Sequence, residues 1–173
     1  MFAGKTLKLH DLYNDVPEHQ RLMIKHSDDN RFGKIGNDFV VCHNGKKIPA
    51  IAVSSLEELK ITPERYANLK LIAVDEGHFF VDIDKHATQW ALHGKQVLVT
   101  GVCRDLFFAP ILSMSRLMAQ ADNITFLTTV CGLCKGVAGF NYRRTPLPQI
   151  SNFVLKFMGG ADDYISLCRT CYY

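Results

Sequence analysis

The stretch Leu69-Lys-Leu-Ile-Ala-Val-Asp-Glu-Gly-His78 decides the fold, because it is an apolar run that ends in two adjacent carboxylates. A short apolar run closed by polar residues predicts a strand buried on both faces, as in a parallel sheet. Further strand candidates are Arg21–Lys25, Gln96–Gly101 and Ile124–Val130. Helix-like spacing of apolar residues covers Lys5–Val16, Phe80–His93 and Ile111–Gln120. This alternation predicts an α/β fold with a parallel sheet and flanking crossover helices.

The carboxylates that end the central run, Asp75 and Glu76, are typical of a Walker B pair. In that arrangement the aspartate holds the water shell of Mg²⁺ and the glutamate lies beside the γ-phosphate. The tripeptide Gly4-Lys5-Thr6 matches the last part of a P-loop, where glycine admits phosphate, lysine reaches its oxygens and threonine binds Mg²⁺. Each feature alone has an explanation without nucleotide binding. An acidic pair after a strand can be a solvent-exposed turn, and a Gly-Lys-Thr tripeptide is common in proteins. Together they favour a P-loop nucleotide site.

A full P-loop needs a glycine four residues before Gly4 and a strand before that. We therefore expect the chain as given to lack the first strand and the first half of the P-loop, either as a truncated gene product or as a degenerate form. Glu76 leaves two enzyme classes open. In an ATPase it would activate water, and in a kinase it would accept the proton of an acceptor hydroxyl.

Two Cys-x-x-Cys pairs lie near the end of the chain, Cys131-Gly-Leu-Cys134 and Cys168-Arg-Thr-Cys171. They could be disulfides or redox dithiols, but two pairs in one short region favour the tetrahedral Cys₄ shell of structural zinc. The segment between the pairs would then be a loop closed at its base by the metal, and a candidate lid. The other thiols, Cys42 and Cys103, are expected to be buried or incidental. We expect residues 1–129 to form the P-loop domain, residues 130–173 a small zinc-binding lobe, and Lys34–Ala52 a loop or hairpin at the sheet edge.

Composition excludes several classes of function. A chain of 173 residues with 47% hydrophobic residues can form one well-cored domain and a small satellite. The net charge is only +3 and the basic residues are scattered, so no nucleic-acid partner is expected. The apolar runs are too short to cross a membrane and no signal peptide opens the chain, so no membrane partner is expected. Thiols kept free for metal indicate a reducing, cytoplasmic compartment.

The longer motifs of the chain are Met1-Phe-Ala-Gly-Lys-Thr6, Asp28-Asp-Asn-Arg-Phe-Gly33, Val74-Asp-Glu-Gly-His-Phe-Phe80, Val130-Cys-Gly-Leu-Cys134 and Gly159-Gly-Ala-Asp-Asp-Tyr-Ile-Ser-Leu-Cys-Arg-Thr-Cys-Tyr172. In these motifs the chain resembles the cytosolic, type II thymidine kinases, over nearly its whole length. The resemblance implies ATP-dependent phosphorylation of thymidine and deoxyuridine at the 5′-hydroxyl, in nucleotide salvage for DNA synthesis. It also implies a homotetramer that uses ATP, Mg²⁺ and a structural Zn²⁺.

The resemblance also implies roles for single residues. Glu76 would be the catalytic base, and Thr6 and Asp75 would hold Mg²⁺. The residues near ATP and its phosphates would be Gly4, Lys5, Thr6, Asp29, Arg31, Asp75 and His78. The nucleoside would contact Met1, Phe79, Val99, Cys103, Phe108, Phe157, Met158, Gly159 and Tyr164. Two of these aromatic residues, Phe79 and Tyr164, could instead be core residues that do not contact the nucleoside.

The chain departs from the family pattern at two places. The segment Thr100–Phe108 keeps Gly101 and Phe108, but Cys103 replaces an aromatic residue and Arg104 is all that remains of a basic pair. His78 stands where the family usually has glutamine. A second hypothesis is therefore a catalytically weak paralogue that acts as a nucleotide-binding or regulatory subunit. A macromolecule-directed ATPase and a zinc-dependent nucleic-acid binder are less favoured.

Overall fold

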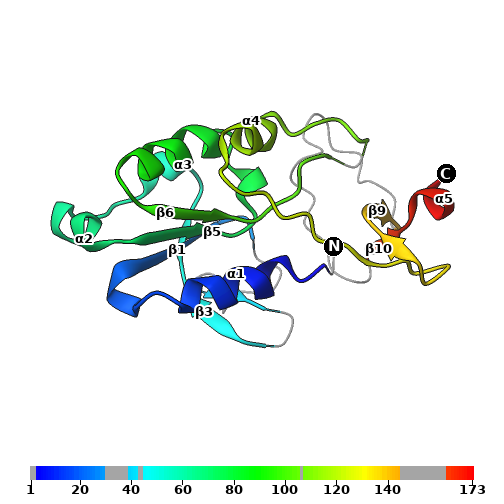
Figure 1. The fold of residues 1–173 in the computed structure, drawn as a ribbon, viewed down its shortest axis with the longest axis horizontal. Coiled ribbons are helices and arrows are strands. Elements are labelled where there is room, and N and C mark those ends of the chain that lie inside the picture. The colour runs from blue at the N-terminus through cyan, green and yellow to red at the C-terminus, as the bar shows by residue number, and fades with distance from the viewer. Residues whose placement is uncertain (1–2, 30–38, 43–44, 106, 145–162) are drawn as a thin grey trace.

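A four-stranded parallel sheet forms the centre of the molecule (Figure 1). The computed structural model describes residues 3–29, 39–42, 45–105, 107–144 and 163–173. The strands lie in the order β4-β1-β5-β6, and every neighbouring pair is parallel. Their bounds are β1 Arg21–His26, β4 Ile51–Val53, β5 Leu71–Val74 and β6 Gln96–Val99. The predicted α/β fold and three of the predicted strands are confirmed.

Helices cover both faces of this sheet, as Figure 1 shows. They are α1 (Lys5–Asn14) on one face, and α3 (Ile83–Leu92) and α4 (Leu112–Gln120) on the other. Alternate residues of β5 point to opposite faces, so Leu71 packs with α1 whereas Ile72 packs with α3 and α4. All four residues of β5 are buried, which explains why its sequence is continuously apolar. The three predicted helices are therefore confirmed, with ends that differ by a few residues.

The region between β1 and β5 contains elements that the sequence predicted only in part. Strands β2 (Phe39–Val41) and β3 (Lys47–Pro49) form an antiparallel hairpin, as expected. The next strand, β4, was not foreseen, and it extends the main sheet by pairing with β1. The short elements η1 (Glu18–Gln20), η3 (Leu56–Glu58) and α2 (Pro63–Asn68) complete this region. Helix α2 was also missed, although Thr62 caps it by accepting from the Arg65 N–H and Pro63 opens it.

The strand expected at Ile124–Val130 is wrong for most of its length. Only β7 (Thr129–Val130) is a strand, and it pairs antiparallel with β8 (Val137–Ala138) outside the main sheet. Phe126 is 70% exposed, so residues before β7 are not packed in a sheet. An apolar β-prone sequence becomes a strand only where a neighbouring strand satisfies its backbone groups.

The C-terminal region adds two small antiparallel pairs and a last helical turn. Besides β7 and β8 it contains β9 (Phe140–Arg143), β10 (Tyr164–Leu167) and α5 (Arg169–Tyr172). Its own small core is built on Cys131, Ala138 and Leu167. The Arg104 guanidinium, which follows β6, donates to the Gly139 carbonyl at 2.7 Å and thereby joins this region to the main sheet. Within the described part of the chain, no helix has the length and apolar character needed to cross a bilayer.

Candidate active site

The start of α1 meets the end of β5 at the carboxyl edge of the sheet. Gly4 precedes the helix with φ 75°, a left-handed conformation that favours glycine. The Thr6 hydroxyl lies 3.4 Å from Asp75 Oδ2 and 3.5 Å from Oδ1. The free N–H groups of a helix start attract phosphate, and hard oxygen ligands attract Mg²⁺. Three of the residues that the sequence assigned to phosphate and Mg²⁺ therefore lie together: Gly4, Thr6 and Asp75.

Asp75 is held from the neighbouring strand by Thr100, a residue that the sequence analysis did not assign. Asp75 is 2% exposed and accepts a hydrogen bond from Thr100 Oγ1 at 2.5 Å. The same hydroxyl oxygen accepts from the Glu76 N–H at 3.3 Å. The carboxyl ends of parallel strands lie at the same edge of a sheet. Thr100 is a polar residue just after β6, and this position was the sequence signal that could have placed it beside Asp75.

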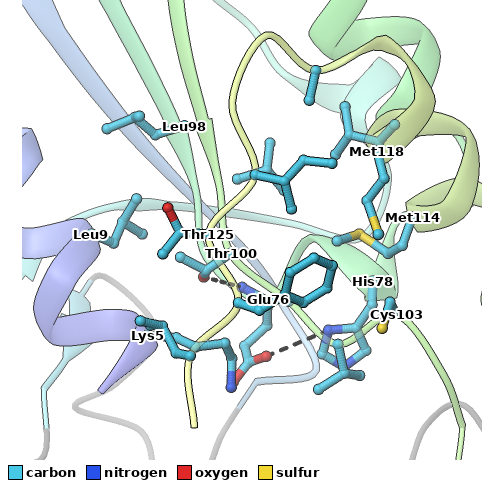
Figure 2. A pocket seen from close by; sticks show the side chains of 18 of the residues that line it. Lys5, Leu9, Glu76, His78, Leu98, Thr100, Cys103, Met114, Met118 and Thr125 are labelled. Carbon is cyan, nitrogen blue, oxygen red and sulfur yellow. Dashed lines mark hydrogen bonds and ion pairs between the residues drawn. The ribbon is translucent and has the colours of Figure 1, made fainter. Parts of the chain in front are cut away.

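Glu76 is presented by an unusual backbone turn. Its φ of 50° and ψ of 46° are left-handed, a conformation uncommon for residues other than glycine. It opens η4 (Gly77–Phe79), and the Gly77 N–H donates to the Thr100 carbonyl at 2.7 Å. The carboxylate of Glu76 lies 3.4 Å from His78 Nδ1, and only 8% of the residue is exposed. Figure 2 shows this carboxylate between Lys5 and His78.

Asp29 lies after the end of β1, where Lys25 holds it. The buried Lys25 ammonium donates to the Asp29 carbonyl at 2.6 Å and lies 4.0 Å from its carboxylate. Lys25 was not assigned from the sequence, although a lysine inside an apolar strand was the signal. Cys42 is buried as expected, with its sulfur 3.8 Å from the Thr6 carbonyl. Burial raises the pKa of the Cys42 thiol, and the Asp75 carboxylate raises it further.

A cavity of about 920 Å³ brings many of the remaining predicted residues together. The predicted site residues in its wall are Lys5, Glu76, His78, Phe79, Val99, Cys103, Phe108 and Tyr164. Leu9, Leu98, Met114 and Met118 add apolar surface (Figure 2). The lining is more apolar than polar and includes charged side chains, a mixture typical of a small-molecule site. Met1, Arg31, Phe157, Met158 and Gly159 lie outside the described residues.

Tyr164 enters this cavity from β10. The residue is 6% exposed, and its hydroxyl lies 3.5 Å from an Arg143 guanidinium nitrogen. Burial raises the pKa of Tyr164, and the positive charge of Arg143 offsets only part of this increase. The phenol therefore keeps its proton at neutral pH and can donate a hydrogen bond.

The four cysteines of the two Cys-x-x-Cys pairs form one cluster. The sulfurs of Cys131, Cys134, Cys168 and Cys171 all lie within 4.8 Å of one another, and none is in a disulfide. The Cys134 and Cys168 sulfurs are 3.6 Å apart. Tetrahedral zinc with Zn–S bonds of 2.3 Å places sulfurs about 3.8 Å apart, so the cluster fits that ion. The backbone N–H groups of Cys134 and Cys168 lower the pKa of Cys131 to about 6, whereas hydrogen bonds with the Cys168 and Cys134 thiols raise the pKa of Cys171 to about 12.

The backbone around the first pair is closely packed. The Cys131 N–H donates to the Gly136 carbonyl at 2.7 Å, and the Gly132 N–H donates to the Ser166 carbonyl at 2.8 Å. A Cβ at Gly132 would lie 2.4 Å from the end of the Ile165 side chain. Glycine at this position therefore lets the two halves of the cluster approach.

Comparisons with known proteins find similar sequences over nearly the whole chain. A family model described as "Thymidine kinase" matches residues 1–172. The chain is 34% identical to "Thymidine kinase 1" of Dictyostelium discoideum, over 99% of this chain and 74% of that protein. It is 33% identical to "Thymidine kinase" of Yaba monkey tumor virus (strain VR587), over 100% of this chain and 90% of that protein. It is also 33% identical to "Thymidine kinase" of Mesomycoplasma hyopneumoniae (strain 7448), over 99% and 90% respectively.

Proposed function

The chain belongs to the thymidine kinase family, and from this premise we propose that it transfers the γ-phosphoryl group of ATP to the 5′-hydroxyl of thymidine and deoxyuridine. The observation that carries the proposal is one cavity with Lys5 and Glu76 in its wall, next to the Thr6–Asp75 contact. A cation for phosphate, a base for a hydroxyl and an apolar chamber for a pyrimidine are the parts that this reaction requires.

In the proposed reaction, Glu76 accepts the proton of the 5′-hydroxyl as its oxygen attacks the γ-phosphorus. The bond from that phosphorus to the β,γ-bridging oxygen breaks, and ADP leaves. Lys5 neutralises charge on the phosphate oxygens. Thr6 and Asp75 would hold Mg²⁺, which supplies further positive charge to those oxygens.

The apolar part of the cavity is proposed to hold the nucleoside. Phe79 and Phe108 offer ring surfaces, and Val99 and Cys103 complete an apolar wall. Tyr164 is the protonated phenol described above, and it can donate to the sugar or the base. Gly4, Asp29, His78 and Arg31 are kept as proposed ATP-side residues, with Met1 and residues 157–159 as further nucleoside contacts.

Other features of the proposal rest on the family relationship. We propose a structural Zn²⁺ on the four cysteines, a lobe of residues 130–173 that closes over the nucleoside, and a homotetramer. We also propose a cytoplasmic location and a role in nucleotide salvage for DNA synthesis. None of these requires a nucleic-acid or membrane partner.

The test is phosphorylation of thymidine by the purified chain with Mg²⁺ and ATP, followed by separation of the monophosphate. Glu76→Gln keeps the size of the side chain but removes the base, so turnover should fall by about 10²-fold or more while thymidine binding changes little. Glu64→Gln, on the exposed first turn of α2, is the matched control and should not change turnover.

Unchanged turnover in Glu76→Gln would place the base elsewhere. A chain that binds ATP but phosphorylates no pyrimidine nucleoside would contradict the proposal and support the regulatory-subunit hypothesis.

A further inference from the structure

His78 makes a contact that the proposed reaction does not yet use. Its Nδ1 lies 3.4 Å from Glu76 Oε2, and the two side chains are only 10% and 11% exposed. We infer that His78 is a positioning residue that holds the Glu76 carboxylate toward the acceptor hydroxyl. This inference rests on the proposed role of Glu76 as the base.

The imidazole has little freedom to move away from Glu76. Its ring centroid lies 4.3 Å from that of Phe79, at a tilt of 36°. On another side, a Cβ at Gly101 would lie 3.3 Å from both the backbone N and Nδ1 of His78. The ring is therefore closely packed by an aromatic side chain and a glycine backbone, which keep its Nδ1 near the carboxylate.

Glu76 needs such a contact because its side chain is flexible and lies in a charged surrounding. The charged residues that line the same cavity are Lys5, Lys8, Lys95, Arg104, Asp105 and Asp122. Figure 2 shows Lys5 on the opposite side of the carboxylate from His78. Without His78 the Glu76 carboxylate would turn toward the Lys5 ammonium. Paired with that lysine, the carboxylate would point away from the 5′-hydroxyl of the nucleoside. A protonated Nδ1, 3.4 Å from Oε2 on the side away from Lys5, offers the carboxylate a second partner that balances that attraction.

The kinetic test compares two replacements of His78. His78→Phe keeps a ring that can stack on Phe79 but removes the donor, so kcat should fall by about 10- to 100-fold with nearly unchanged KM for thymidine. His78→Gln places an amide N–H donor at similar reach and should recover most of kcat. An equal loss in both variants, or no loss in His78→Phe, would overturn the inference.

A matched control separates this role from a general effect of replacing a histidine. His86 Nε2 lies 3.3 Å from Asp82 Oδ2 and its ring lies 5.8 Å from that of Trp90, so it forms a similar pair away from the cavity wall. His86→Phe should leave kcat unchanged. A loss of kcat there as large as in His78→Phe would show that neither effect is specific, and would overturn the inference.

A second measurement does not depend on activity. Nitrogen-15 NMR of the His78 ring at one fixed pH should show the proton on Nδ1 in the unmodified chain. In Glu76→Gln part of that proton should move to Nε2, because the charged acceptor is gone. An unchanged spectrum would show that the two groups do not pair, and the inference would fail. If they pair but the chain phosphorylates no nucleoside, the proposed function fails, and with it the catalytic use of the pair.

Discussion

At Glu76 the backbone turns through a left-handed conformation that costs of the order of 1 kcal/mol for a residue with a Cβ. The turn persists because Glu76 and Gly77 both donate their N–H groups to Thr100. Strained residues of this kind occur at functional sites, where packing around them holds the strain. The sequence located Glu76 as the end of a strand, but its hydrogen-bond partner lies 24 positions away and is not visible in a local pattern.

A prediction at this scale concerns Gly77. A Cβ there would lie 2.5 Å from Val99 Cγ1, a stiff β-branched side chain that cannot turn away freely. Gly77→Ala should therefore lower the free energy of unfolding by about 1–3 kcal/mol, as overpacking does. Urea denaturation measures this. Gly139→Ala is the control, since nothing lies within 4 Å of its added Cβ, and it should change stability by less than about 0.5 kcal/mol. Equal stability of both variants would show that the turn is not tightly packed.

At the scale of elements, strands β7 to β10 and α5 are too short to be stable alone. Their shared core contains one buried cysteine, Cys131, with Ala138 and Leu167. Such a small apolar core stabilises little, so the cluster of four cysteines is the feature that can hold these elements together once it binds metal. The spacing of the cysteines predicted the cluster. It did not predict that β9 and β10 would pair as the strands between them.

Replacing one ligand tests this view. Cys168→Ser should reduce bound zinc from about one ion per chain to almost none, because a hydroxyl is a poor ligand for this ion. The amides of β9 and β10 should then exchange hydrogen faster. Elemental analysis and hydrogen exchange measure both effects. Cys103→Ser, outside the cluster, should keep its zinc. A metal-free chain with β9 and β10 still protected would contradict this account.

At the scale of the whole molecule, the sheet is less covered on its β6 side. The residues Val97, Leu98 and Val99 are half-buried, whereas every residue of β5 is buried. Among the residues that the structure describes, β6 is one of the two edge strands, and both β6 and residues 123–129 line the cavity. Ala3 and Lys5 line the same cavity. A strand paired in parallel with the outer edge of β6 would end at the edge of the sheet where α1 begins.

We therefore expect a short apolar strand ending in Gly-Pro, fused ahead of Met1, to pair with β6. It should slow hydrogen exchange of the Val97–Val99 amides and reduce aggregation, because it covers a sheet edge. It should also tighten Mg²⁺-ATP binding by about tenfold, which corresponds to about 1.4 kcal/mol, since it adds N–H groups near the phosphates. A fusion with two prolines in the strand is the control. If both fusions behave like the unmodified chain, the space beside β6 does not accept a strand.

The sequence by itself determined the elements whose signal is local. Strands β1, β5 and β6 and helices α1, α3 and α4 were predicted because burial leaves a regular apolar pattern in each segment. The four cysteines were predicted because metal ligands come in characteristic spacings. The motifs also identified the family that the comparisons confirm.

Only the tertiary structure decided which segments pair and which side chains meet. Ile51–Val53 joined the main sheet, whereas the longer segment Ile124–Val130 did not, because a strand needs a partner that its own sequence does not specify. The contacts Thr100–Asp75 and His78–Glu76 likewise depend on where two strands end and how one turn is held. Hydrogen bonds and strand pairs join groups distant in the chain, and the free energy that selects them arises only when the fold brings those groups together.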